Sequence, residues 1–75
     1  MIRERWTLTG KTALVTGATA GIGLAIAEEL TRFGANVIRV ARKNADINAD
    51  VTIAEDRQRM FAGLERLDIL VNNAG

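Results

Sequence analysis

The 75-residue sequence predicts an α/β fold, part of a doubly wound parallel sheet with about four strands and two main helices. Two observations predict it. Short apolar runs alternate with longer segments in which apolar residues recur at helical spacing. A glycine-rich turn, residues 16–23, connects the first apolar run to the first helical segment. Strands that alternate with helices in this way typically form a parallel sheet.

The first strand and the first helix lie on either side of the glycine-rich turn. Residues 12–16 contain the continuous run Ala13-Leu14-Val15, which predicts a strand buried on both faces. After the glycines we expect an amphipathic helix of about three turns that ends before Gly34. Its apolar face is predicted to consist of Ile22, Ile26, Leu30 and Phe33.

The second and third strands are predicted close together in the chain. Residues 36–41 are rich in β-branched side chains, and Arg39 within them lies along an edge or extends its charge from one face. Residues 42–46 separate this strand from a weak candidate at 47–51, whereas a parallel crossover usually takes a dozen or more residues. Either a short extended loop leads into a short third strand, or residues 47–51 are irregular.

The second helix is predicted to begin at a capping box. In the segment from Thr52 to Glu55, the hydroxyl and the carboxylate can each satisfy a free backbone amide. We expect the apolar face of this helix to contain Ile53, Met60, Phe61, Leu64 and Leu67. Residues 68–72, which are apolar at their centre, predict a last buried strand.

The glycine-rich turn has the features of a dinucleotide phosphate site. A bound phosphate needs a close backbone, free amides and the positive end of a helix dipole. Gly17 and Gly21 allow the turn and the close approach, while Gly23 lets the helix pack near the strands. Thr19 and Ala20 offer further donors. An ordinary glycine-rich turn is the alternative interpretation.

The end of the second predicted strand selects between the two nicotinamide dinucleotides. An acidic residue there would bind the ribose 2′-hydroxyl of NAD, whereas an Arg accommodates the 2′-phosphate of NADP. The sequence has Ala41-Arg42-Lys43 at this point, without a carboxylate. We therefore expect NADP as the cofactor, with NAD less favoured. The alternative is that Arg42 and Lys43 are only solvated loop charges.

Composition argues against several other classes of partner. The net charge is +1 and the charged residues are interspersed, so the sequence predicts neither nucleic-acid nor membrane binding. The chain has no Cys and no His, and we predict no metal ligand. No apolar run reaches the length of a signal-peptide core or a membrane span. We expect a soluble cytoplasmic protein.

Taken together, the motifs resemble the N-terminal part of a short-chain dehydrogenase/reductase. Residues 8–17 resemble the opening of that family, residues 16–23 match its T-G-x-x-x-G-x-G turn, and residues 67–75 match its L-D-x-L-V-N-N-A-G segment. The resemblance implies a Rossmann fold in which residues 1–75 are the N-terminal part of a single dinucleotide-binding domain. The family's usual helix between the second and third strands is missing or reduced to residues 42–46.

The resemblance also implies roles for individual residues. Asp50 would hydrogen-bond the adenine amino group with Val51 beside the ring, while Asn73, Ala74 and Gly75 would line the adenosine and ribose side. A plain turn role for Asp50 is the alternative. The predicted cofactor-binding residues are Gly17, Thr19, Ala20, Gly21, Ile22, Gly23, Arg42, Asp50, Val51, Asn73, Ala74 and Gly75.

The activity that the resemblance implies is hydride transfer between NADP(H) and a carbonyl or alcohol substrate. The family's catalytic Ser, its Tyr with a Lys four residues on, and a further Asn all lie beyond residue 75, and the chain has no Tyr. We therefore predict no catalytic residue in the chain and expect its C-terminal catalytic part to be absent. A small-molecule substrate would bind only to the intact protein, and the 75-residue chain alone is predicted to be inactive.

Two further interpretations remain open at this point. The same phosphate site could serve a non-catalytic dinucleotide-binding or redox-sensing module. The last predicted strand would also expose an unpaired edge and apolar surface, which favours self-association.

Overall fold

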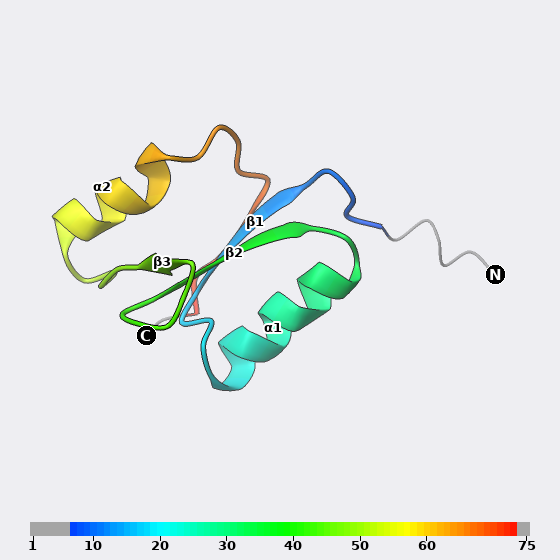
Figure 1. Ribbon diagram of the computed structural model, residues 1–75, viewed down its shortest axis with the longest axis horizontal. Helices are drawn as coiled ribbons and strands as arrows, with labels where there is room; N and C mark the ends of the chain where they lie inside the picture. Colours follow the sequence, from blue (N-terminus) through cyan, green and yellow to red (C-terminus); the bar gives the residue numbers. More distant parts are fainter. Residues whose placement is uncertain (1–6, 74–75) are drawn as a thin grey trace.

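The computed structural model describes residues 7–73 of the chain. Its elements, in chain order, are β1 (Thr12–Thr16), α1 (Gly21–Arg32), β2 (Asn36–Ala41), β3 (Ile47–Asn48), α2 (Ala54–Ala62) and β4 (Ile69–Val71). The strands form one parallel sheet in the order β3-β2-β1-β4. Figure 1 shows α1 and α2 on opposite sides of this sheet. The predicted α/β fold is therefore confirmed.

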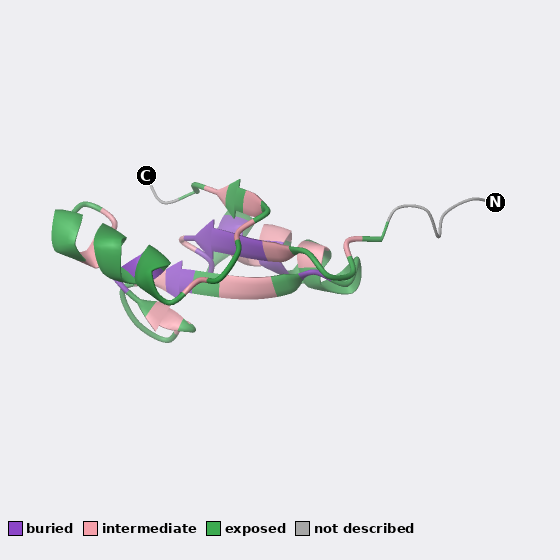
Figure 2. Ribbon diagram, turned by 90° about the horizontal axis from the view of Figure 1, so that it is seen from above, coloured by how far each residue is buried: buried purple, intermediate pink, exposed green. Residues whose placement is uncertain are grey.

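Alternate residues of β1 point to opposite faces of the sheet and build two separate cores. Leu14 packs with Val40 of β2 and Met60 of α2. Val15 packs on the other face with Ala27 of α1. A strand with helices on both faces must be apolar throughout, which explains the continuous run in β1. Figure 2 shows β1 buried along most of its length, while most of α2 is exposed.

Helix α1 packs through small residues, which corrects the apolar face predicted for it. Gly23 and Ala27 are buried with Leu30 packed beside them, whereas Ile22 is 72% exposed and Phe33 is 42% exposed. The spacing of the large apolar side chains therefore did not fully predict which face of α1 is buried. The start of the helix approaches the preceding turn so closely that a glycine must face it, and this contact sets the rotation of the helix.

The connection between β2 and β3 is a short loop without a helix, so the first of the two alternatives is confirmed. Residues 42–46 make the whole connection, and Val40 of β2 lies opposite Ile47 of β3. Strand β2 lies between β1 and β3, so Arg39 is not on an edge strand. Arg39 is in register with Val15 and shares the sheet face on which α1 packs.

Helix α2 begins without the predicted capping box. Its N-cap is Ile53, and no side chain caps it. The Thr52 hydroxyl donates instead to the Asp50 carboxylate at 2.6 Å. The capping-box prediction is wrong because this hydroxyl is engaged by the preceding turn.

The apolar face predicted for α2 is only partly correct. Met60 is buried, and Leu64 and Leu67 after the helix pack against the same core. Ile53 and Phe61 are 44% and 41% exposed. Within residues 7–73, neither helix is long and apolar enough to cross a membrane.

Polar contacts lie at both ends of β4 and limit it to fewer residues than the predicted 68–72. At its start, the Asp68 carboxylate accepts the backbone N–H of Thr12 at 2.8 Å. At its end, the Thr16 hydroxyl lies 3.2 Å from Oδ1 of Asn72, to which it donates. These contacts fix β4 beside β1 along the whole length of β1.

Candidate functional site

The glycine-rich turn leaves β1 in a conformation that favours glycine. Gly17 and Gly21 have φ angles of +63° and +60°, in the left-handed region. The backbone N–H of Gly17 donates to the carbonyl of Val40 at 2.8 Å. This bond attaches the turn to the end of β2, so the carboxyl ends of β1 and β2 lie at one edge of the sheet.

Gly23 brings α1 into close contact with the turn. A Cβ atom at this position would lie 2.1 Å from the carbonyl oxygen of Gly17 and 2.6 Å from Nδ2 of Asn73. Such distances leave no room for any side chain, so the close approach at Gly23 is to the turn and Asn73, whereas the sequence predicted packing near the strands. The helix N-terminus is thereby held directly behind the turn.

The N-terminus of α1 is suited to an anion. Its N-cap, Ala20, has no side chain that could cap the helix, and the first turn contains no acidic residue. Ala20, Gly21 and Ile22 are all exposed. The positive end of the helix dipole and the amides of the first turn therefore face solvent with no carboxylate of the first turn to neutralise them.

A hollow of ≈ 560 Å³ lies at the same edge of the sheet. It is formed by the turn after β1, the end of β2 with the loop that follows, and the segment after β3. Its lining consists of Gly17, Thr19, Val40, Ala41, Arg42, Lys43, Ala49, Asp50, Val51 and Thr52. Ligand sites in open α/β sheets lie at the carboxyl ends of the strands, which is where this hollow is.

The hollow gathers predicted residues that are far apart in the sequence, namely Gly17, Thr19, Arg42, Asp50 and Val51. The predicted residues at the start of α1, which do not line it, are Ala20, Gly21, Ile22 and Gly23. Asn73 does not line it either, and its side chain donates to the Gly17 carbonyl at 3.4 Å. Ala74 and Gly75 lie outside the described residues.

Several lining residues were not among the predicted site residues. Lys43 was considered only as a charge at the strand tip, and Ala49 and Thr52 were not considered as site residues. The register of β3 could have indicated them, because the carboxyl ends of neighbouring parallel strands meet at one edge.

Asp50 is held as an acceptor beside the hollow. The Thr52 hydroxyl and the Thr52 backbone N–H both donate to its Oδ1, at 2.6 and 2.9 Å. These two hydrogen bonds lower the pKa of the Asp50 carboxyl, with a smaller contribution from the charge of Arg42 and against a small opposing effect of desolvation. An ionised carboxylate accepts hydrogen bonds only, which suits it to bind an amino group.

Thr16 links the end of β4 to the glycine-rich turn. Its hydroxyl oxygen accepts the backbone N–H of Asn73 at 2.9 Å. Since Asn73 also donates to the Gly17 carbonyl, two hydrogen bonds join the end of β4 to the end of β1 and the turn after it. In this structure Asn73 contacts the turn rather than the hollow.

The sequence pattern of the short chain dehydrogenase family matches residues 11–75. The chain belongs to the short chain dehydrogenase family. The match covers the sheet, both helices and the glycine-rich turn, so the resemblance noted in the sequence is confirmed.

Two members of the family illustrate how much of a relative the chain covers. A tropinone reductase homolog of Arabidopsis thaliana is 36% identical in an alignment of 96 positions, gaps included, that covers 96% of this chain and 35% of the relative. D-beta-hydroxybutyrate dehydrogenase of Cupriavidus necator is 38% identical in an alignment of 89 positions, gaps included, that covers 91% of this chain and 34% of the relative. The chain therefore spans about a third of the length of these short chain dehydrogenases.

Solved structures of the family share the fold described above. Pseudomonas aeruginosa RhlG, in a complex with NADP, is 35% identical with a TM-score of 0.86, over 99% of this chain and 38% of RhlG. A Beutenbergia cavernae protein assigned as an NAD(P) dependent gluconate 5-dehydrogenase, with NADP bound at low occupancy, is 35% identical with a TM-score of 0.80. The match covers 93% of this chain and 36% of that protein.

Proposed function

We propose that this chain is the cofactor-binding part of an NADP-dependent oxidoreductase. The complete protein would transfer hydride between NADP(H) and a carbonyl or alcohol substrate. The observation that carries the proposal is the placement of two cations, Arg42 and Lys43, on the same hollow as the glycine turn and Asp50. NADP in the solved structures of RhlG and of the gluconate dehydrogenase supports the same cofactor class.

The residues present fit a dinucleotide. The hollow, at ≈ 560 Å³, falls within the range of about 300–1,000 Å³ usual for ligand pockets. Amides of the turn and of the first turn of α1 would bind the pyrophosphate. Asp50 would accept a hydrogen bond from the adenine amino group, and Arg42 would bind the ribose 2′-phosphate.

Binding and chemistry are divided between parts of the protein in this proposal. Bound NADPH supplies the hydride, and residues 1–75 hold it as the N-terminal part of a single domain. Acid and base groups would come from the remainder of the complete protein. We retain a cytoplasmic location as a prediction from composition, and NAD as the less favoured cofactor.

Dinucleotide selectivity tests the cofactor assignment. In the complete protein, Arg42→Ala should raise the Kd for NADPH about tenfold, because a charge-assisted hydrogen bond to phosphate is lost, and should change the Kd for NADH little. Arg32→Ala is the matched control, since Arg32 is an exposed cation paired with Glu29 on α1. Equal affinity of the unmodified protein for both dinucleotides would contradict NADP preference.

Turnover by the complete protein distinguishes the oxidoreductase from a non-catalytic module. The proposal expects NADPH oxidation with at least one carbonyl compound from a broad panel. Tight dinucleotide binding without any turnover would instead favour the redox-sensing alternative.

We also propose that the 75-residue chain self-associates through β4. Strand β4 is at one edge of the described sheet, and Leu70 within it is 53% exposed. An open edge of this kind pairs readily with another strand. If light scattering showed the 75-residue chain to be a monodisperse monomer, that result would argue against self-association through β4.

A further inference from the structure

The loop between β2 and β3 carries the two cations of the hollow, and this chain builds it without the usual crossover helix. Residues 42–46 span two parallel neighbours, a connection that usually takes a dozen or more residues and a helix. Arg42 and Lys43 are the first residues of this loop, and Asp46 is the last. The geometry of so short a loop depends on how its last residue is fixed.

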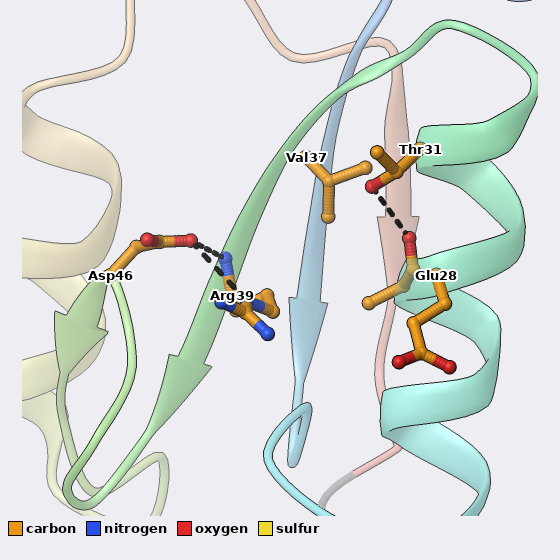
Figure 3. A pocket seen from close by; sticks show the side chains of 6 residues that line it. Glu28, Thr31, Val37, Arg39 and Asp46 are labelled. Carbon is orange, nitrogen blue, oxygen red and sulfur yellow. Dashed lines mark hydrogen bonds and ion pairs between the residues drawn. The ribbon is translucent and has the colours of Figure 1, made fainter.

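Asp46 is fixed to the neighbouring strand by its side chain. Oδ2 of Asp46 accepts the backbone N–H of Arg39 at 2.8 Å and lies 3.8 Å from Nε of Arg39 (Figure 3). In a longer β3, a backbone carbonyl would accept the N–H of Arg39 from β2. Here the Asp46 carboxylate in the loop accepts it instead.

The sheet face around this contact is polar, as expected where no crossover helix covers it. A hollow of ≈ 420 Å³ lies there between α1, β2 and the loop, lined by Ala27, Glu28, Thr31, Val37, Arg39 and Asp46. Figure 3 shows the Arg39 and Asp46 side chains meeting across the sheet, with Glu28 and Thr31 on α1. The two paired side chains are 44% and 50% exposed, so the ion pair itself stabilises little. The hydrogen bond from the Arg39 backbone N–H to Asp46 therefore constrains the loop more than the ion pair does.

Other bonds hold the rest of the loop, and Asp46 adds a side-chain attachment to β2 beside the backbone pairing of β3. The Ala45 backbone N–H donates to Oδ1 of Asn48 at 3.1 Å, and Asn44 has a φ of +61°. The Ala49 N–H donates to the Ala41 carbonyl at 2.8 Å. These contacts define a tight turn, and the Asp46 bond sets where that turn lies relative to the hollow that Arg42 lines.

We infer that Asp46 is a positioning residue for dinucleotide selectivity. By holding the end of the loop against Arg39, Asp46 keeps Arg42 and Lys43 at the hollow. There the two cations favour NADP, which carries a ribose 2′-phosphate, over NAD. The inference rests on the proposed function for its ligand. Asp46 lies on the opposite side of the loop and is not among the residues that line the cofactor hollow.

Direct binding measurements on the complete protein test the selectivity. Asp46→Ala should raise the Kd for NADPH several-fold while the Kd for NADH changes less than twofold, since only NADPH carries the 2′-phosphate. Asp46→Asn keeps an oxygen that can accept the Arg39 N–H and should retain most of the selectivity. Glu29→Ala is the control. It removes a carboxylate on α1 that is also exposed and paired with an Arg, and it should change neither Kd. Equal weakening of both dinucleotides would show a merely structural role and overturn the inference.

Limited trypsin digestion tests the positioning without any cofactor. Cleavage after Arg42 and Lys43 should become several-fold faster in Asp46→Ala relative to cleavage after Arg32 in α1, and Asp46→Asn should stay near the unmodified protein. Unchanged relative cleavage would overturn the inference even if NADPH binds. If the unmodified protein showed no NADPH preference, the proposed cofactor would fail, while the cleavage ratio would still decide whether Asp46 holds the loop.

Discussion

The guanidinium of Arg66 binds both carboxylate oxygens of Asp68, with N···O distances of 2.9 Å for each. The same carboxylate accepts the backbone N–H of Thr12, and the Asp68 N–H donates to the Thr12 carbonyl at 2.9 Å. One acidic side chain thus joins the starts of β1 and β4, which are distant in the sequence.

Removal of this carboxylate should destabilise the fold in a pH-dependent way. The Arg66 hydrogen bonds, with the Thr12 N–H, lower the pKa of Asp68 below its unfolded value. Its stabilising contribution is therefore complete above the unfolded pKa of about 3.9 and is lost as pH falls through the folded pKa. Asp68→Ala should lower the urea midpoint of the complete protein at pH 7, and the difference should shrink at pH values below 3.9. Glu65→Ala is the control, and a pH-independent difference would contradict the prediction.

Gly23 should tolerate no side chain. A Cβ atom 2.1 Å from the Gly17 carbonyl must displace either α1 or the turn, so Gly23→Ala should lower the free energy of unfolding by about 3 kcal/mol. Gly63→Ala is the matched control, because a Cβ there meets nothing within 4 Å and Gly63 has an ordinary φ of −93°. Chemical denaturation of the two variants measures both effects. Equal stability of Gly23→Ala and the unmodified protein would show that the helix does not pack as described.

The Thr52 hydroxyl should control the ionisation of Asp50. Thr52→Val removes the strongest cause of the lowered Asp50 pKa and preserves side-chain shape, so the pKa should rise toward its ordinary value. NMR titration of the Asp50 carboxyl carbon measures it. Thr31→Val, which removes a hydroxyl bonded to the Ala27 carbonyl on α1, should leave the Asp50 pKa unchanged.

The 75-residue chain alone should not reduce carbonyl compounds. It has no Tyr, which the family resemblance implies as the acid and base of the reaction, and it has no His or Cys either. Absorbance of NADPH at its reduced-nicotinamide band should stay constant in the presence of the chain and a carbonyl panel. Measurable oxidation above the rate without protein would refute this expectation.

The strands were more predictable than the faces of the helices. The apolar run of β1 is typical of a strand covered on both sides, and the predicted bounds are those observed. The apolar face of α1 was only partly predicted: Leu30 packs as expected, but the buried contacts of Gly23 and Ala27 are ones that a count of large apolar residues overlooks. At α2, local pattern could not reveal that Asp50 engages the Thr52 hydroxyl.

The sequence predicted those parts of the candidate site that depend on the glycine-rich backbone or on charged side chains. Gly17, Thr19, Arg42, Asp50 and Val51 were named from sequence and line one hollow. Their binding roles stay predictions. The loop contact of Asp46 was beyond sequence reasoning, because a pairing of strand backbone with a side chain seven residues on follows no periodicity. Only the register of β2 and β3 brings these groups together.

The central place of β1 sets an order of assembly during synthesis. Its pairing with β2 can form as soon as the chain has reached residue 41, whereas its contacts with β4 join residues 56 positions apart. A ribosome that has released only the first βαβ unit therefore presents β1 with one side paired and the other bare. While α2 and β4 are still being translated, the unpaired edge of β1 can form backbone hydrogen bonds with a strand of another chain.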